Sequence, residues 1–191
     1  GAGASSHSDD PARYAPSSYA RDLASAVDTL GLGRFMLVGH SLGTLVARYY
    51  IRDHADRVSA LALMAGPDPS LPARTSAELA QRAGRAGTTA PEAPADSWMA
   101  QHQGLSADTR AALWQDIRSN PSERTAGQAP PWPGLDGEAA KIEAATLVIL
   151  GDADDVVPPE TAVRGYLELA PERRSLHVFH GVGHFPNAQV P

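Results

Sequence analysis

Apolar residues along the chain follow two alternating spacings, one typical of helices and one typical of strands. Residues 18–30 have the helical spacing and predict an amphipathic helix that ends in a glycine-containing turn. Residues 35–38 form a short apolar run, as in a strand buried on both faces of a parallel sheet. A second helix is expected directly after Ser41, and a second strand over residues 58–64. Strand, helix and strand in this order form a βαβ unit, so the pattern predicts an α/β fold.

This alternation is interrupted over residues 66–141, which contain most of the prolines and no recognisable strand. We interpret the segment as a helical insertion, with helices near residues 76–83 and 107–117. The alternation then resumes with a buried strand over 146–150, a helix over 159–170 and a last strand over 175–179. The chain is therefore expected to consist of a core formed by residues 1–66 and 144–191, and a helical insertion over residues 67–143.

Composition narrows the classes of function. The chain has 191 residues, of which 42% are hydrophobic and 20% charged, enough for one globular domain with a sizeable core. The net charge of −6 and the absence of a basic stretch argue against nucleic acid and against an anionic membrane surface. No apolar run approaches the roughly 20 residues of a membrane helix. The lack of cysteine excludes thiolate catalysis and leaves the redox compartment open, so cytoplasmic localisation is only the default.

The segment Gly39-His40-Ser41-Leu42-Gly43 matches the pattern G-x-S-x-G and lies between a predicted strand and a predicted helix. In such a turn a side chain at either glycine is expected to collide with the adjoining strand or helix, and the strained turn exposes the serine hydroxyl. The helix directs its N-terminal N–H groups at an attacked carbonyl, with that of Leu42 nearest. We therefore expect Ser41 to be a nucleophile and His40 to be a packing residue of the turn.

A serine nucleophile requires a base and an acid that orients the base. Three carboxylates, Asp152, Asp154 and Asp155, follow the predicted strand over 146–150, where parallel sheets place residues that contact ligands. Two histidines, His180 and His184, follow the last predicted strand. Position along the chain alone does not select one acid or one base. The other histidines, at positions 7, 54, 102 and 177, form no metal-binding pattern.

Three motifs in this order, GHSLG, GDADDVVPP and GVGHFP, resemble those of the α/β-hydrolase superfamily. The resemblance implies that Asp154 is the acid and His184 the base, with Asp152 and Asp155 as solvated loop or capping residues. Asp68 is the alternative acid, since some members carry theirs after the preceding strand. The first residues, Gly-Ala-Gly-Ala-Ser, resemble the loop that precedes the helix ahead of the nucleophile in this superfamily.

The resemblance implies a serine hydrolase that acts through an acyl-enzyme on a small or medium carboxylic ester, thioester or lactone. It implies no metal and no organic cofactor. In the superfamily a helical insertion at this position of the fold forms a cap over the site. The resemblance therefore implies that residues 67–143 of this chain form a cap. Three tryptophans of this insertion are candidate walls of an acyl pocket, with packing inside the cap as the alternative: Trp98, Trp114 and Trp132.

Two alternatives remain open at this point. Ser41 argues against the branches of the superfamily that use an aspartate nucleophile, but C–C bond hydrolases and cofactor-free haloperoxidases share the same triad. Members of the superfamily also have several strands before the nucleophile, including a loop with the second oxyanion N–H, and a final helix after the histidine. None of these is recognisable here. We therefore expect the strand over 35–38 to lack a neighbour, and a missing N-terminal segment or a complementary chain to supply the rest of the sheet. A non-catalytic fragment or binding subunit is the rival interpretation.

Overall fold

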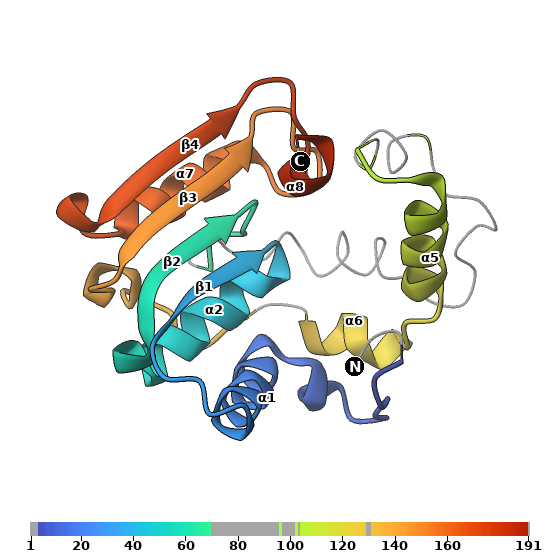
Figure 1. Ribbon diagram of the computed structural model, residues 1–191, viewed down its shortest axis with the longest axis horizontal. Coiled ribbons are helices and arrows are strands. Elements are labelled where there is room, and N and C mark those ends of the chain that lie inside the picture. Colours follow the sequence, from blue (N-terminus) through green and yellow to red (C-terminus); the bar gives the residue numbers. More distant parts are fainter. Residues whose placement is uncertain (1–3, 70–95, 97–101, 103, 129–130, 191) are drawn as a thin grey trace.

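The computed structural model describes residues 4–69, 96, 102, 104–128 and 131–190. Within these residues, strands form one parallel sheet of four in the order β1-β2-β3-β4 (Figure 1). All four strands were expected from the apolar runs, and each matches its prediction to within two residues at either end. Their bounds are β1 Phe35–His40, β2 Val58–Met64, β3 Ala145–Gly151 and β4 Arg174–Phe179.

Helices α2 (Leu42–Asp53) and α7 (Pro159–Glu168) cover one face of this sheet, and α1 (Pro16–Thr29) packs against α2 (Figure 1). Both α1 and α7 begin with proline, whose fixed φ suits the first helical position. The sequence β1-α2-β2 confirms the predicted βαβ unit. The remaining described helices are α5 (Ala107–Arg118), α6 (Ser122–Gln128) and α8 (Pro186–Gln189), with short 3₁₀ turns at Pro11–Tyr14, Ala55–Arg57, Ala139–Lys141 and Pro171–Arg173.

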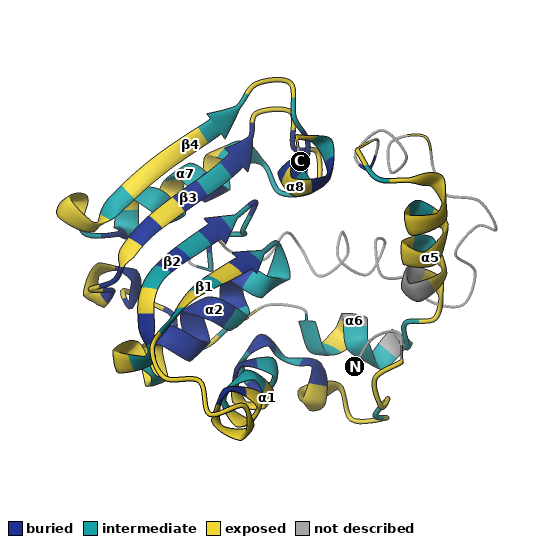
Figure 2. Ribbon diagram, in the orientation of Figure 1, coloured by how far each residue is buried: buried dark blue, intermediate teal, exposed yellow. Residues whose placement is uncertain are grey.

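The hydrophobic core lies between α2 and the covered face of the sheet. Leu45 and Tyr50 of α2 are fully buried there, and the Tyr50 ring lies 5.8 Å from that of Phe35 between centroids. Val58 and Val148 bring β2 and β3 into the same cluster. Figure 2 shows α2 as an almost continuously buried helix, which is why the helix carrying the G-x-S-x-G turn is firmly held.

The opposite face of the sheet is open over the described residues, and here the expectation of a first strand buried on both faces is wrong. Met36 is 72% exposed and Val38 61% exposed, because α2 and α7 pack only on the other face (Figure 2). In the parallel register Val38 pairs with Ala62, and Ala62 with Leu147, which forms an apolar row across the open face. This row lines a groove with a volume of about 250 Å³. Strands β1 and β4 are the two edges of the described sheet, so β1 pairs with β2 on one side and with no other described strand.

The segment 67–143 contains helices and, in its described part, no strand. Helix α5 confirms the prediction for residues 107–117, whereas the predicted helix 76–83 lies outside the described residues. Helix α6 packs against the 3₁₀ turn Pro11–Tyr14, close to the start of the chain. The boundaries of core and insertion stay a prediction.

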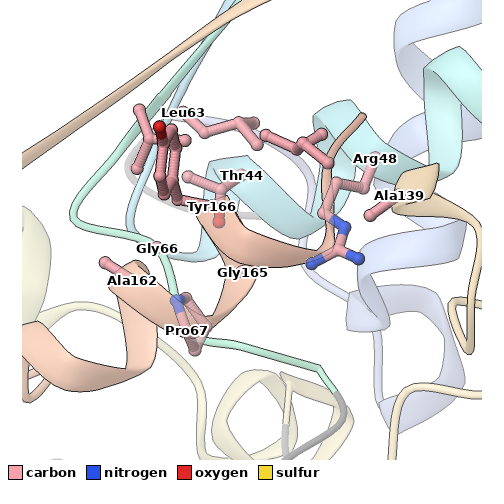
Figure 3. A pocket seen from close by; sticks show the side chains of 11 residues that line it. Thr44, Arg48, Leu63, Gly66, Pro67, Ala139, Ala162, Gly165 and Tyr166 are labelled. Carbon is pink, nitrogen blue, oxygen red and sulfur yellow. The ribbon is translucent and has the colours of Figure 1, made fainter. Parts of the chain in front are cut away.

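A buried ion pair connects the end of this segment to α2. Arg48 is 4% exposed, and its Nε donates a hydrogen bond to Glu138, while its Nη2 lies 3.5 Å from a carboxylate oxygen of Glu168. Figure 3 shows Arg48 at the edge of a small cavity beside Ala139. Burial raises the pKa of Glu138, and the positive charge of Arg48 acts in the opposite direction. The pair holds the chain leading into β3 against the middle of α2.

We expect Glu138→Gln to reduce the free energy of unfolding by about 3–5 kcal/mol, because it leaves the buried guanidinium without its main counter-charge. Urea unfolding followed by circular dichroism measures this. The matched control is Asp53→Asn in the exposed pair Arg52–Asp53, which should cost less than about 1 kcal/mol. Equal losses in the two variants would contradict the role assigned to the buried pair. The double variant R48M/E138M should recover most of the loss.

Candidate active site

Ser41 occupies the sharp turn between β1 and α2. It is the N-cap of α2 with φ 53° and ψ −123°, a backbone conformation that side-chain-bearing residues rarely adopt. Such a conformation costs about 1–3 kcal/mol and persists only where the surrounding structure holds it. The Ser41 N–H donates to the carbonyl of Met64 in β2 at 2.9 Å, which anchors the turn to the sheet.

Of the two glycines of the turn, only Gly39 is required to avoid a steric collision. A Cβ at Gly39 would lie 2.4 Å from the carbonyl oxygen of Gly43, so the strand and the helix approach each other too closely for a side chain. At Gly43 a Cβ would meet no described atom within 4 Å outside its chain neighbours and the backbone of its own helix. The expected collision is therefore present at Gly39 and absent at Gly43, because the first turn of α2 directs position 43 away from the strand.

Asp154 follows β3 and is almost completely buried. Its Oδ1 accepts hydrogen bonds from the backbone N–H groups of Val156 and Val157, both at 2.8 Å. Its Oδ2 lies 2.8 Å from Nδ1 of His184. A carboxylate whose two oxygens are satisfied in this way stays in one orientation and presents one oxygen to the imidazole.

His184 connects the acid to the serine. A carboxylate only accepts, so Nδ1–H donates to Asp154, which leaves Nε2 as an acceptor 2.8 Å from Oγ of Ser41. The His184 residue is 3% exposed, so its bond to Asp154 is buried, whereas its bond to the partly exposed Ser41 is only partly buried. The structure thus brings together three predicted site residues that lie 143 and 30 positions apart in the sequence.

The loops that carry Asp154 and His184 lie directly against each other. A Cβ at Gly151, the last residue of β3, would stand 2.0 Å from the carbonyl oxygen of Val182, so only glycine permits this approach. The same carbonyl accepts the N–H of Ala153 at 3.0 Å. Gln189 of α8 accepts the N–H of Gly183 at 2.7 Å. The histidine loop is therefore fixed from both sides immediately before His184.

The competing residues lie elsewhere. Asp152 is a loop-capping residue, as expected: it accepts the Gly181 N–H at 2.6 Å and lies 2.9 Å from Nδ1 of His180. The hydrogen bonds from His180 and Gly181 lower the pKa of Asp152. His180 and Asp155 are exposed, and Asp68 is buried just after β2. The Nδ1–H of His184 points to Asp154 and to none of these alternatives.

His40 has a role that the sequence interpretation missed. Its Nε2 lies 2.7 Å from the carbonyl oxygen of His184, and its ring centroid lies 5.1 Å from that of His184 and 5.0 Å from that of Phe185. It was expected only to pack in the turn. The signal that could have revealed it is its position directly before the nucleophile, at the carboxyl end of β1, where the ends of parallel strands meet.

Leu42 is the first residue of α2, so its N–H has no carbonyl within the helix to donate to and lies beside Ser41. Of the three tryptophans, Trp98 lies outside the described residues and Trp114 is on α5, partly buried. Trp132 packs against the hydrophobic core, and its indole N–H donates to the carbonyl of Gln128 at 3.1 Å. Trp132 therefore contacts the main core and not only the insertion, and the role of these tryptophans as pocket walls stays a prediction.

Possible metal ligands and a small cavity are two further features that bear on the chemistry of the site. In the part of the chain that the structure describes, no group of three or more His, Asp or Glu side chains could hold a metal ion. The cavity beside Arg48 measures about 20 Å³, roughly the room of one water molecule, and none of Ser41, Asp154 or His184 lines it (Figure 3). It is therefore separate from the candidate site.

None of the described helices is long and apolar enough to cross a membrane.

Comparison with known proteins agrees with the fold described above. A family model described as the alpha/beta hydrolase fold matches residues 1–189. The chain belongs to the α/β-hydrolase fold family. Among curated relatives, a protein of Klebsiella pneumoniae subsp. pneumoniae named "Putative carbamate hydrolase RutD" is 45% identical over 56 residues, which cover 29% of this chain and 21% of that relative. The matched segment thus spans about a fifth of the relative's length.

Solved α/β-hydrolase structures resemble most of the chain. A thermophilic esterase from Thermogutta terrifontis superposes with a TM-score of 0.68 at 24% identity, covering 92% of this chain and 67% of the esterase. A bromoperoxidase from Bacillus anthracis gives a TM-score of 0.77 at 19% identity, covering 99% of this chain and 74% of the bromoperoxidase. At these identities the likeness concerns the fold.

We expect Gly39→Ala to destabilise the protein by about 1–3 kcal/mol, because the added methyl overlaps the backbone of α2. Gly43→Ala, the matched control in the same turn, should be neutral or stabilise by up to about 1 kcal/mol through helix propensity. Thermal unfolding of both variants measures the difference. A Gly43→Ala variant as unstable as Gly39→Ala would contradict the conclusion that position 43 has room for a methyl group.

The acid assignment predicts that Asp154→Asn lowers hydrolytic turnover by about 10³–10⁴-fold, because the amide no longer supports the imidazolium or selects its tautomer. Asp152→Asn and Asp155→Asn, on the same loop, should lower it far less. Turnover of a short chromogenic ester measures all three. The assignment to Asp154 fails if one of the neighbouring variants loses as much activity as Asp154→Asn.

Proposed function

We propose that this chain carries the active site of a serine hydrolase acting on small or medium carboxylic esters, thioesters or lactones. The observation that supports this most directly is the continuous chain of hydrogen bonds from Asp154 through His184 to Ser41, with 2.8 Å at each link. It has the order and the donor directions that nucleophilic catalysis by serine requires. Membership in the α/β-hydrolase fold family supports the same conclusion.

In this mechanism Ser41 Oγ attacks the substrate carbonyl carbon while Nε2 of His184 accepts the hydroxyl proton. Asp154 stabilises the imidazolium through the bond to Nδ1, and the Leu42 N–H donates to the developing oxyanion. His184 then returns the proton to the leaving alkoxide or thiolate, and an acyl-enzyme on Ser41 remains. Water then attacks the carbonyl carbon of this ester while His184 takes a proton from the water. The bond from the acyl carbon to Ser41 Oγ breaks, His184 returns the proton to Oγ, and the carboxylic acid leaves.

A haloperoxidase or a C–C bond hydrolase is the second candidate, because the same fold and triad serve these reactions. Solved structures with the same fold include both a bromoperoxidase and a meta-cleavage product hydrolase, at 19% and 20% identity, so the likeness favours neither of the two. A panel of a short ester, a thioester, a lactone and a halide with peroxide distinguishes the reaction classes. A carbamate belongs in the panel because of the name that the curated relative carries.

We also propose that the active protein includes further sheet, from a longer chain or a complementary partner. Three observations support this. Among the described residues, the apolar face of β1–β3 is open and one edge of β1 has no partner strand. The chain also covers only 67% and 74% of the two solved structures. Parallel sheets are normally covered on both faces. A non-catalytic fragment or binding subunit would have the same open face, so the reactivity of Ser41 has to separate the two.

Labelling with a fluorophosphonate tests the proposed function. The reagent should add one mass increment to the protein, because an activated serine forms a stable phosphonyl ester. Ser41→Ala should abolish the mass increment, and His184→Ala should strongly slow the rate of labelling. Both effects are expected in the 191-residue chain and in a longer parent. The parent should label faster than the 191-residue chain. The matched control is Ser25→Ala, on the exposed side of α1, which should label as the unchanged protein does. A folded parent that never labels would falsify the hydrolase proposal and favour the binding subunit.

A further inference from the structure

His40 donates a hydrogen bond to the main chain of the catalytic base candidate. The carbonyl oxygen of His184 can only accept, so the atom 2.7 Å away, Nε2 of His40, carries the proton. The His40 ring lies within 5.1 Å, between centroids, of the rings of both His184 and Phe185. Phe185 contacts in turn the ring of His102, 4.0 Å away between centroids, so the partly buried His40 belongs to a cluster of four rings.

The surroundings of His40 favour its neutral form. Burial lowers its pKa, as do the charges of His184 and His102, whereas the bond to the His184 carbonyl and the charge of Asp154 act in the opposite direction. A neutral imidazole with its proton on Nε2 keeps the donated bond. It also adds no second positive charge beside His184 when that residue becomes an imidazolium during acyl transfer.

Two successive residues of the G-x-S-x-G turn therefore hold the same histidine at two points. Ser41 Oγ meets the ring of His184 at Nε2, and His40 meets its main-chain oxygen. On the other side the Nδ1 of His184 is held by Asp154. With the backbone oxygen and both ring nitrogens held, the ring cannot shift along the turn without breaking a bond.

We propose that His40 is a positioning residue, which holds the main chain of His184 so that its Nε2 stays opposite Ser41 Oγ. The inference rests on the proposed serine hydrolase function but concerns a residue outside the triad. Its effect should fall on the step in which the proton moves. Misplacement of a catalytic group by about 1 Å can cost about a hundredfold in rate, without any change in how the substrate binds.

The test compares two nearly isosteric variants, His40→Gln and His40→Met. The glutamine amide nitrogen can take the place of Nε2 as a donor, whereas the methionine side chain has no donor. We expect kcat for a short ester to be about 10–100-fold lower in H40M than in the unchanged protein, with KM unaltered. The kcat of H40Q should be at least about tenfold higher than that of H40M. His54→Met, which removes a ring stacked on Tyr50 at the far end of α2, is the control and should not change kcat.

A second readout does not depend on turnover. The Nδ1 proton of His184, held by Asp154, should give a downfield proton NMR signal in the unchanged protein and in H40Q, and a shifted or broadened one in H40M. Equal kcat values and equal spectra in H40Q and H40M would overturn the proposal. If H40M does not fold, His40→Asn replaces it, because its amide is one methylene too short to reach the carbonyl. An unchanged protein that never labels at Ser41 refutes the proposed function instead, and the NMR comparison still decides the role of His40.

Discussion

The buried hydrogen bond between Asp154 and His184 is the interaction on which the last part of the chain depends. A carboxylate removed from water is costly unless its oxygens find donors, and Asp154 meets this need with two backbone N–H groups besides the imidazole. These bonds require the loops after β3 and β4 to be in contact. The contact is possible because Gly151 has no side chain to place against the carbonyl of Val182.

The serine side of the site depends on a different constraint. Ser41 is held in a strained conformation, which the protein maintains by fixing the helix that follows it. The middle of helix α2 is buried by core residues such as Leu45, and the buried ion pair between Arg48 and Glu138 also holds it. The nucleophile is therefore presented by a rigid element, whereas the base is presented by a loop. Bonds from neighbouring groups give that loop comparable order.

The sheet is asymmetric, and this affects how the chain can function. Its site residues lie along the carboxyl ends of the strands, where the loops of parallel sheets meet. One face carries α2 and α7, while the other exposes apolar residues such as Met36 and Val38. The hydrogen bonds that join Asp154, His184 and Ser41 have the geometry that the proposed serine hydrolase requires, and among the described residues the sheet beside them is open on one face. The geometry of the triad and the covering of the sheet are thus separate questions.

Local signals in the sequence were sufficient for the four strands and for helices α1, α2, α5 and α7, because periodicity, prolines and glycines act over a few residues: the strand predicted over 58–64 is β2 without any change of bounds. The short helices α6 and α8 were not predicted. The motif G-x-S-x-G likewise located the turn at Ser41. Burial of β1 could not be predicted, since an apolar run is the same whether or not something covers it. The bond from His40 to His184, 144 positions away, was decided only by tertiary structure. Residue type states what a side chain can donate or accept, but the approach of distant segments determines which partner it meets.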